Sequence, residues 1–291
     1  MTSPDTGADA DLDAPTLARK AYRTLEPLHV LGYFAPEPTE RMAALGVKGG
    51  MRAYFAMRAA PMGVVPAEVV VATFFNFAPQ QVAKAIPSVW DVTTPEAATA
   101  ARYEGVDAAY RRVLGEPVLE SAELAEAAAL AREATTVCDP VGRPLFAAHA
   151  SLPWPDPPHL QLFHAQTLLR EHRGDAHVAA LMLAGLDGIE ALVGYVPLNQ
   201  GLPEELLRAT RGWDDEAWDA AAGRLRDRGL LAADGSLTEA GQQQRTAMEA
   251  QTDIASAAPY QHLGAERTQR LRELARPWSR TITESMFGGG K

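Results

Sequence analysis

Apolar residues recur at three- and four-residue spacing along most of the chain, which is the period of an amphipathic α-helix. Ala dominates this pattern and usually stands beside Leu, Glu or Arg, residues with a low free-energy cost in a helix. The pattern predicts a mainly α-helical fold, with helices at residues 15–31, 40–45, 50–60, 67–75, 79–86, 95–114, 122–137, 159–172, 175–193, 203–210, 216–228 and 266–286. Gly185 and Gly188 are candidate interruptions of the helix at 175–193.

A turn-rich segment divides these predicted helices into two groups. It runs from Asp139 to Pro144, where prolines and a glycine end one helix and favour turns. We therefore expect an N-terminal helical domain at 15–138 and a C-terminal domain at 139–291, whose closing helix packs against the first helix of the chain. Residues 1–14 are polar and acidic, without helical periodicity, and are predicted to form a disordered tail.

Some short phrases recur in the same order in both predicted domains. Leu28-His29 stands before a Pro-bearing aromatic segment, as Ala148-His149 does before Trp154, and Trp90-Asp91 resembles Trp213-Asp214. These recurrences indicate a degenerate duplication, with a winged helix in each half and a ligand pocket between the halves. Identical positions are few, and an Ala-rich chain produces such matches by chance, so a single C-terminal winged helix stays the alternative.

The stretch 202–248 has the pattern of a winged helix. A short helix and the turn Gly212-Trp213 stand before Asp214, a residue suited to cap the helix at 216–228. Two short apolar segments then flank Ala233-Asp234-Gly235-Ser236, and Asp-Gly is a strong β-hairpin signal. We expect a small β-hairpin wing here, followed by a long helix.

Two resemblances rest on these motifs. The run Arg224–Leu231, followed by Asp234-Gly235 and Leu237–Gly241, resembles the recognition helix, wing and next helix of MarR-type winged-helix regulators. Nearly the whole chain after the tail resembles an actinobacterial family of helix-turn-helix proteins without a settled activity, through phrases such as Thr24–His29, Arg58–Pro61 and Gly142–His149. MarR-type proteins dimerise through their terminal helices, so this resemblance implies a homodimer or an internal pseudo-dimer.

The charge pattern argues against nucleic-acid binding. The chain has a net charge of -10, whereas a nucleic-acid binding surface is normally basic. The first turn of the predicted recognition helix, which would meet the DNA backbone, instead carries four carboxylates. The arginines Arg224, Arg226 and Arg228 lie at the opposite end, where they suit the helix dipole. We therefore expect the winged helix to be a scaffold without DNA readout.

The remaining composition points to a cytoplasmic protein that does not enter a membrane. Cys138 is the only cysteine, so no intramolecular disulfide forms, as is typical of a reducing compartment. The acidic N-terminus lacks the basic and apolar regions of a signal peptide, and the most apolar stretch, 64–77, is too short and too interrupted to span a bilayer.

The histidines are the first candidates for a site. His29, His149 and His164 stand beside aromatic segments, and His164 shares a helix face with Leu160 and Leu168. Such histidines are hydrogen-bonded core residues, ligand-pocket residues or haem ligands, and the spacing does not separate these roles. His177 follows Asp175, a candidate helix cap, and the HExxH pattern of a zinc site is absent, so we expect no metal ligands.

Aromatic and polar residues complete the candidate pocket. Tyr33, Tyr54 and Trp154 could form aromatic walls, although most such stripes are core. Arg58 follows an aromatic helix and could bind a carboxylate with its planar guanidinium group, or else cap the helix end. Asn76 interrupts an apolar run and either caps a helix or faces a cavity.

No catalytic or cofactor motif decides the function. Nucleophile-elbow, phosphate-binding and dinucleotide-binding patterns are absent, so no cofactor is indicated and the reaction, if any, is undefined. The leading hypothesis is a small-molecule-binding protein on a winged-helix scaffold, with or without a simple catalytic role. The alternatives are a MarR-like ligand-responsive transcription regulator and a histidine-based metal or haem enzyme.

Overall fold

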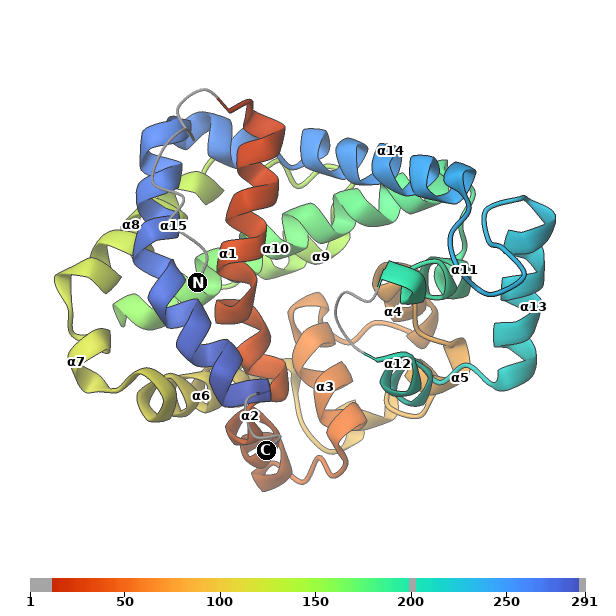
Figure 1. The fold of residues 1–291 in the computed structure, drawn as a ribbon. Coiled ribbons are helices and arrows are strands. Elements are labelled where there is room, and N and C mark those ends of the chain that lie inside the picture. The colour runs from red at the N-terminus through yellow and green to blue at the C-terminus, as the bar shows by residue number, and fades with distance from the viewer. Residues whose placement is uncertain (1–11, 199–202, 288–291) are drawn as a thin grey trace. The chain divides into compact units, whose positions relative to one another are not determined.

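The computed structural model describes residues 12–198 and 203–287, and within these ranges every regular element is a helix (Figure 1). The expected mainly α-helical fold is confirmed. The chain forms two compact units: unit 1 comprises residues 1–41, 100–174 and 253–291, and unit 2 comprises residues 42–99 and 175–252. Each unit takes segments from both sides of residue 138. The division into domains at 15–138 and 139–291 stays a prediction. Most of the predicted tail, residues 1–11, lies outside the described ranges.

Unit 1 is built from the helices at the start, middle and end of the chain. Four of its helices, α2, α6, α10 and α14, continue into unit 2. The helices that contribute to unit 1 are α1 (Ala14–Phe34), α2 (Pro36–Ala44), α6 (Pro95–Leu114), α7 (Glu116–Leu119), α8 (Ala122–Thr135), α9 (Pro144–Ala150), α10 (Pro158–Leu183), α14 (Glu239–Ala255) and α15 (Ala258–Phe287).

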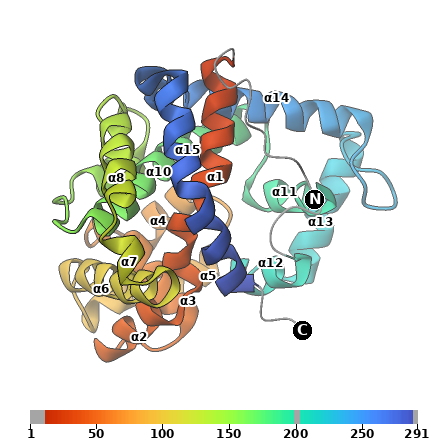
Figure 2. The same ribbon diagram turned by 60° about the vertical axis from the view of Figure 1, so that its left-hand side comes forward.

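The first and last helices pack side by side in unit 1 (Figures 1 and 2). α1 begins at a capped end, where Asp13 accepts a hydrogen bond from the Thr16 amide at 2.9 Å. Its buried residues, including Leu17, recur at helical spacing and face buried residues of α15 in one hydrophobic core. The Ser279 hydroxyl donates to the Thr24 carbonyl at 2.7 Å, which ties the two helices together.

α10 differs from its predicted form. We expected one helix to end at His172 and Asp175 to cap the next, but the structure has one continuous helix from Pro158 to Leu183. Asp175 is buried inside that helix, with 7% of its surface exposed. Gly174, which lies at the predicted break, costs about 1 kcal/mol in a helix relative to Ala, and burial of the surrounding residues outweighs so small a penalty.

A buried charge network connects α1, α10 and α14 in unit 1. The Arg173 guanidinium lies 2.8 Å from the Asp253 carboxylate and also donates to the Ser256 hydroxyl at 3.0 Å. Arg19 of α1 pairs with the same carboxylate. Because Asp253 is only 3% exposed, two cationic partners are needed to offset the cost of burying its charge.

Unit 2 contains the segment that the sequence identified as helix-turn-helix. Besides the parts of the shared helices, its elements are α3 (Gly50–Ala59), η1 (Ala60–Met62), α4 (Ala67–Phe74), α5 (Pro79–Ala83), η2 (Ser88–Asp91), α11 (Gly188–Val193), η3 (Val196–Leu198), α12 (Glu204–Arg211) and α13 (Asp215–Asp227).

Local sequence signals define the ends of α11, α12 and α13. Asp187 and Glu190 form a capping box at the start of α11. Gly212 ends α12 in the left-handed conformation, with φ 77°, that glycine adopts without strain. Asp214 caps α13 as predicted, because its carboxylate accepts a hydrogen bond from the Ala217 amide at 2.8 Å. Leu207, Trp218 and Leu225 join these helices in one apolar core.

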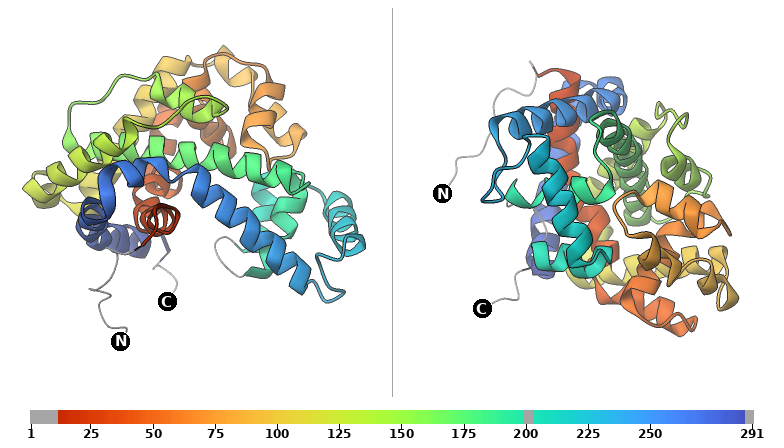
Figure 3. Two further views of the ribbon diagram at one scale, coloured as in Figure 1. Left: turned by 90° about the horizontal axis from the view of Figure 1, so that it is seen from above. Right: turned by 90° about the vertical axis from the view of Figure 1, so that its right-hand side faces the viewer.

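The expected β-hairpin wing is not formed. The loop between α13 and α14 makes one isolated antiparallel bridge, between Leu231 and Leu237, and neither view in Figure 3 shows a strand there. The Ala232 amide donates to the Ser236 carbonyl at 2.8 Å, and the Thr238 amide donates to the Leu230 carbonyl at 3.1 Å. The pairing between the two arms of the loop ends there, because α14 begins at Glu239.

Candidate functional site

Three helices of unit 1 bring polar and aromatic side chains to one place. α1 and α10 approach closely at Gly32, where an added Cβ would lie 3.4 Å from the Phe163 ring and 3.2 Å from Val106 of α6. Residues three or four positions from this crossing lie on the same helix faces, so their side chains meet beside it. We call the set the Arg102 cluster; its members are His29, Tyr33, Arg102, Tyr103, Trp154, Phe163, His164 and Thr167.

His29 is a fully buried member whose hydrogen bonds fix its ring. The Thr167 hydroxyl donates to the Phe163 carbonyl at 2.9 Å, so its oxygen accepts from His29 Nδ1 at 3.0 Å. His29 Nε2 then accepts from the Tyr33 hydroxyl at 3.1 Å. The imidazole also stacks on the Phe163 ring, with centroids 5.7 Å apart. Two predicted site residues, His29 and Tyr33, therefore lie in direct contact.

Arg102 is the charged member of the cluster and is only 2% exposed. Its guanidinium carbon lies 5.5 Å from the Tyr33 ring centroid and 5.2 Å from the Phe163 ring centroid. Nε and Nη2 are buried and have no hydrogen-bond partner within the described part of the chain. Because burying an unpaired cation and leaving its N–H groups unsatisfied both cost free energy, this arrangement calls for an acceptor.

His164 is the second buried group with an unsatisfied nitrogen. Its Nδ1 lies 2.5 Å from the Tyr103 hydroxyl, while Nε2 has no hydrogen-bond partner among the described residues. Burial, together with the positive charges of Arg102 and Arg132, lowers the pKa of His164 to about 4. Burial raises the pKa of Tyr103 to about 12. At neutral pH both side chains are therefore uncharged.

Trp154 connects His164 with the surface of unit 1. The indole packs edge-on against the His164 ring, with centroids 4.6 Å apart. The Trp154 indole also contacts Arg132 of α8, whose guanidinium carbon lies 4.4 Å from the indole centroid. Trp154 is partly exposed and Arg132 is exposed, so this side of the cluster borders solvent.

The Arg102 cluster is suited to bind an anionic or acceptor-rich group. It offers two N–H groups of a buried guanidinium and one unsatisfied imidazole nitrogen, and both charges that act on His164 are positive. Hydrogen bonds to a charged donor are about twice as strong as neutral ones in such a setting. The residues present can orient a ligand, and they include no strongly activated nucleophile.

The other predicted site residues do not all belong to this cluster. His149 is fully buried on α9 of unit 1. Tyr54, Arg58, Asn76 and His177 belong to unit 2. The structure therefore assigns the nine predicted residues to two units rather than to one pocket.

In unit 2, three of these residues have structural roles. The Arg58 guanidinium stacks 4.3 Å above the Phe74 ring and donates to the Tyr54 hydroxyl at 2.9 Å. Phe75, not Asn76, is the C-cap of α4. Asn76 contributes its backbone carbonyl, which accepts a hydrogen bond from the Trp213 indole at 3.0 Å.

His177 lies inside α10 rather than in the first turn of a new helix. Its Nδ1 is 3.0 Å from the Thr252 hydroxyl. That hydroxyl donates to the Met248 carbonyl at 2.9 Å, so it accepts from the histidine. The contact joins α10 to α14 within unit 2.

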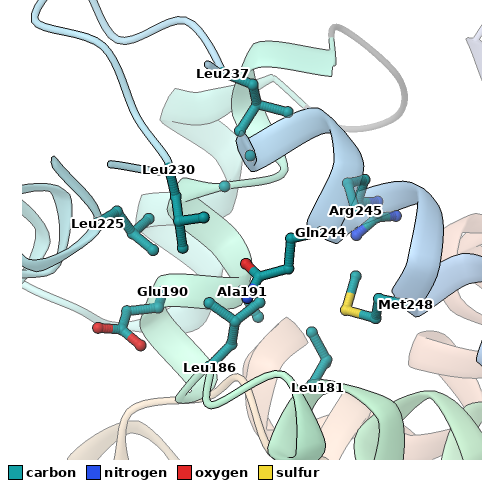
Figure 4. A pocket seen from close by; sticks show the side chains of 12 residues that line it. Leu181, Leu186, Glu190, Ala191, Leu225, Leu230, Leu237, Gln244, Arg245 and Met248 are labelled. Carbon is teal, nitrogen blue, oxygen red and sulfur yellow. The ribbon is translucent and has the colours of Figure 1, made fainter. Parts of the chain in front are cut away.

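Unit 2 also has a shallow depression, which Figure 4 shows between α11, α13 and α14. Its lining is mostly apolar, including Leu230, Leu237 and Met248. Its polar members already have protein partners: Glu190 accepts from Arg224 at 2.8 Å, and Gln244 donates to the Ala184 carbonyl at 3.0 Å. This depression therefore offers fewer unsatisfied groups than the Arg102 cluster.

Two of the three arginines at the end of α13 bind to the protein itself, and the third, Arg226, is exposed. Arg224 lies 2.7 Å from Asp187 and 2.8 Å from Glu190, both on the capping box of α11. Arg228 donates to the carbonyls of Gly185 at 2.8 Å and Ala184 at 3.0 Å. We expected the helix dipole to explain their position, and these ion pairs and hydrogen bonds give a stronger reason.

Metal binding and membrane insertion are two further properties that the described residues bear on. Residues 12–198 and 203–287 contain no group of three or more His, Cys, Asp or Glu side chains arranged to hold a metal ion. No single helix in these ranges is long and apolar enough to span a membrane. Two bent helix pairs, 50–62 with 67–74 and 158–183 with 188–198, reach that length and hydropathy together, as buried core helices also do.

Sequence reasoning missed Arg102, the central residue of the cluster. A signal was present: Arg102 lies four residues after Ala98 and four before Val106, so it shares the apolar face of its helix. An arginine on such a face is rarely buried without a partner. Tyr103 and Thr167 had no comparable signal, because their contacts depend on helices far apart in sequence.

The comparisons with known proteins give one match. The model of a helix-turn-helix family matches residues 18–288, which is nearly the whole chain. No curated protein and no solved structure matches the chain significantly. The match supports the helix-turn-helix architecture and does not extend to a MarR-type or actinobacterial assignment. The chain belongs to this helix-turn-helix family.

Proposed function

We propose that the protein binds a small molecule at the Arg102 cluster and uses its helix-turn-helix architecture as a scaffold that does not read DNA. The observation that carries this proposal is the buried Arg102 guanidinium, whose Nε and Nη2 have no hydrogen-bond partner in the described chain. His164 Nε2 adds a second unsatisfied group to the same cluster. Buried polar groups are nearly always satisfied, so a bound acceptor is the simplest explanation of both.

The surface of α13 supports the second part of the proposal. Its first turn exposes Asp215 and Glu216, and Asp214 stands just before it. Like charges at the phosphate backbone would cost on the order of 1 kcal/mol each. Arg224 and Arg228, two of the three arginines at the other end, are held by α11 and by the turn before it. Of these three arginines, only the exposed Arg226 is left for phosphate contacts.

A ligand-responsive transcription regulator of the MarR type is the second candidate. Membership of a helix-turn-helix family favours it, because such folds commonly bind DNA. In that case the ligand would act by changing the DNA affinity of the protein, as a homodimer or as a pseudo-dimer formed by the two halves of the chain. The candidates share the Arg102 cluster and differ in whether DNA binds at all.

Fluorescence anisotropy with a labelled random DNA duplex separates these candidates. At 20–50 mM salt, roughly the range where phosphate contacts are strongest, we expect no binding below about 100 μM protein. Micromolar binding that weakens steeply with salt would reject the DNA-free scaffold and favour the regulator.

Native mass spectrometry of gently purified protein tests ligand binding separately. We expect a non-covalent added mass that disappears under denaturing conditions. The same protein, unfolded and dialysed before refolding, should regain that mass from a small-molecule extract of the expression host. If neither preparation acquires a mass, the ligand-binding proposal is wrong.

A further inference from the structure

We infer that the ligand carries a carboxylate, and that this group binds side-on to Nε and Nη2 of Arg102. The inference rests on the proposed function and names the chemical class of its ligand. Three observations lead to it: which guanidinium nitrogens lack partners, how the same edge is used elsewhere in this protein, and which charges surround the site.

The two nitrogens without partners form one edge of the guanidinium group. Nε–H and one N–H of Nη2 point in parallel from that edge, at a spacing that matches the two oxygens of a carboxylate. A single hydroxyl or carbonyl would satisfy only one of these donors. The edge therefore selects a planar group with two acceptors.

Arginines elsewhere in unit 1 use the same edge in this way. Arg270 donates from Nε to one Glu126 oxygen at 2.8 Å and from Nη2 to the other at 2.6 Å. Arg112, on the same helix as Arg102, makes the corresponding pair of bonds to Glu37. These two arginines find their carboxylates within the protein, whereas the edge of Arg102 has no such partner among the described residues.

The charges around the site favour a monoanion. Arg102 is a buried cation, and a single negative charge neutralises it. His164 stays neutral above pH 5, because burial and the nearby arginines lower its pKa to about 4. When the Tyr103 hydroxyl donates to Nδ1, Nε2 carries the hydrogen and can donate to the ligand. A phosphate dianion would need a second uncompensated cation. Arg170 lies 5.8 Å from the Tyr33 ring centroid, but it already pairs with Glu26 and Glu171.

The rings around Arg102 favour an aromatic or other apolar body on the ligand. Tyr33 and Phe163 lie against the guanidinium, and the partly exposed Trp154 borders the solvent side of His164. Aromatic surfaces of this kind pack well against flat apolar groups. The ligand class is therefore a small aromatic monocarboxylate.

Isothermal titration calorimetry with sodium benzoate tests this inference on the full-length protein. Benzamide is the matched neutral probe, because it has the same shape without the charge. We expect benzoate to bind at least about tenfold more tightly than benzamide, as the loss of a charge-assisted bidentate contact implies. Arg102→Met should weaken benzoate binding at least about tenfold, while Arg112→Met should leave it unchanged.

A second measurement uses the wild-type protein alone. In its ¹⁵N NMR spectrum, the Arg102 Nε–H signal, assigned from its nuclear Overhauser contacts with the Tyr33 and Phe163 rings, should shift on benzoate addition and not on benzamide addition. Equal binding of the two probes, unchanged benzoate binding by Arg102→Met, or an unshifted Nε–H signal would each overturn the inference. If native mass spectrometry detects an added mass on the wild type that is absent from Arg102→Met, while benzoate and benzamide bind equally, the proposed function survives and the carboxylate inference alone fails.

Discussion

Replacing Arg102 with Met should stabilise the ligand-free protein. Met keeps an unbranched side chain of similar length between the Tyr33 and Phe163 rings, but it removes the buried charge and both unsatisfied N–H groups. Such an effect is unusual, because most substitutions of a fully buried residue destabilise a protein. It follows only if the site is built for a ligand and strained without one.

The size of the effect is a difference between two opposing contributions. Two buried donors without partners cost about 1–3 kcal/mol each, so the substitution recovers about 2–6 kcal/mol. Two cation–π contacts are lost, worth about 0.5–2 kcal/mol each. We therefore expect a net gain of about 1–2 kcal/mol in the free energy of unfolding, which corresponds to a rise of about 2–3 °C in Tm for a chain of this length.

Chemical denaturation with guanidinium measures this change. Both proteins are first unfolded, dialysed and refolded, so that no co-purified ligand adds to the wild-type stability. Arg112→Met is the control on the same helix: its side chain is 48% exposed and pairs with Glu37, so its loss should cost less than about 1 kcal/mol. A loss of more than about 1 kcal/mol in Arg102→Met would show that the arginine is a structural residue and refute the reasoning.

Three further predictions follow from single contacts. Gly105→Ala should destabilise unit 1 by about 1–3 kcal/mol or more in thermal unfolding, because its Cβ would lie 2.4 Å from the Pro38 Cα. Arg224→Ala should cost about 1–3 kcal/mol, because it removes a main partner of the buried Glu190 carboxylate. Below pH 6.5 the unfolded chain protonates His164, whereas the folded chain does so only near pH 4. Through His164, stability should therefore fall across that range by at most about 3 kcal/mol, and His164 adds no pH dependence above it. His172, whose pKa burial also lowers to about 4, adds to the fall over the same range.

Each of these predictions has a control within the chain. Gly223→Ala introduces a Cβ with no atom within 4 Å on the helix α13, so it should be neutral or stabilising. Arg226→Ala changes an exposed side chain and should alter stability by less than about 0.5 kcal/mol. His164→Asn should remove part of the acid sensitivity, and an unchanged pH profile in that variant would contradict the role given to His164.

The helical content and the ends of several helices could be predicted from sequence, because they depend on local signals. Asp214 caps α13 as expected, and Gly212 occupies the turn before it. The prediction of a β-hairpin wing was wrong, because the Asp-Gly signal specifies a turn and does not determine how many residues pair beside it. The predicted helix break near Gly174 was also wrong, because burial of α10 outweighs the weak tendency of glycine to end a helix.

The candidate site was predicted only in part. His29, Tyr33, Trp154 and His164 do belong to one cluster, and aromatic neighbours in the sequence were their signal. Arg102 was missed, although its position on an apolar helix face was visible. The contacts between α1, α6 and α10 join residues more than 50 positions apart, such as His164 with Tyr103. Helical periodicity indicates that a residue faces inward and does not identify what it meets there.

One measurement tests the central claim that the Arg102 cluster holds a small-molecule ligand. Wild-type protein and Arg102→Met are produced in the same host, purified gently in parallel and compared by native mass spectrometry, with Arg112→Met as the control. We predict a non-covalent added mass on the wild type and on Arg112→Met that is absent from Arg102→Met, and accurate mass should identify a carboxylic acid. The same added mass on all three proteins, or on none of them, would contradict the claim.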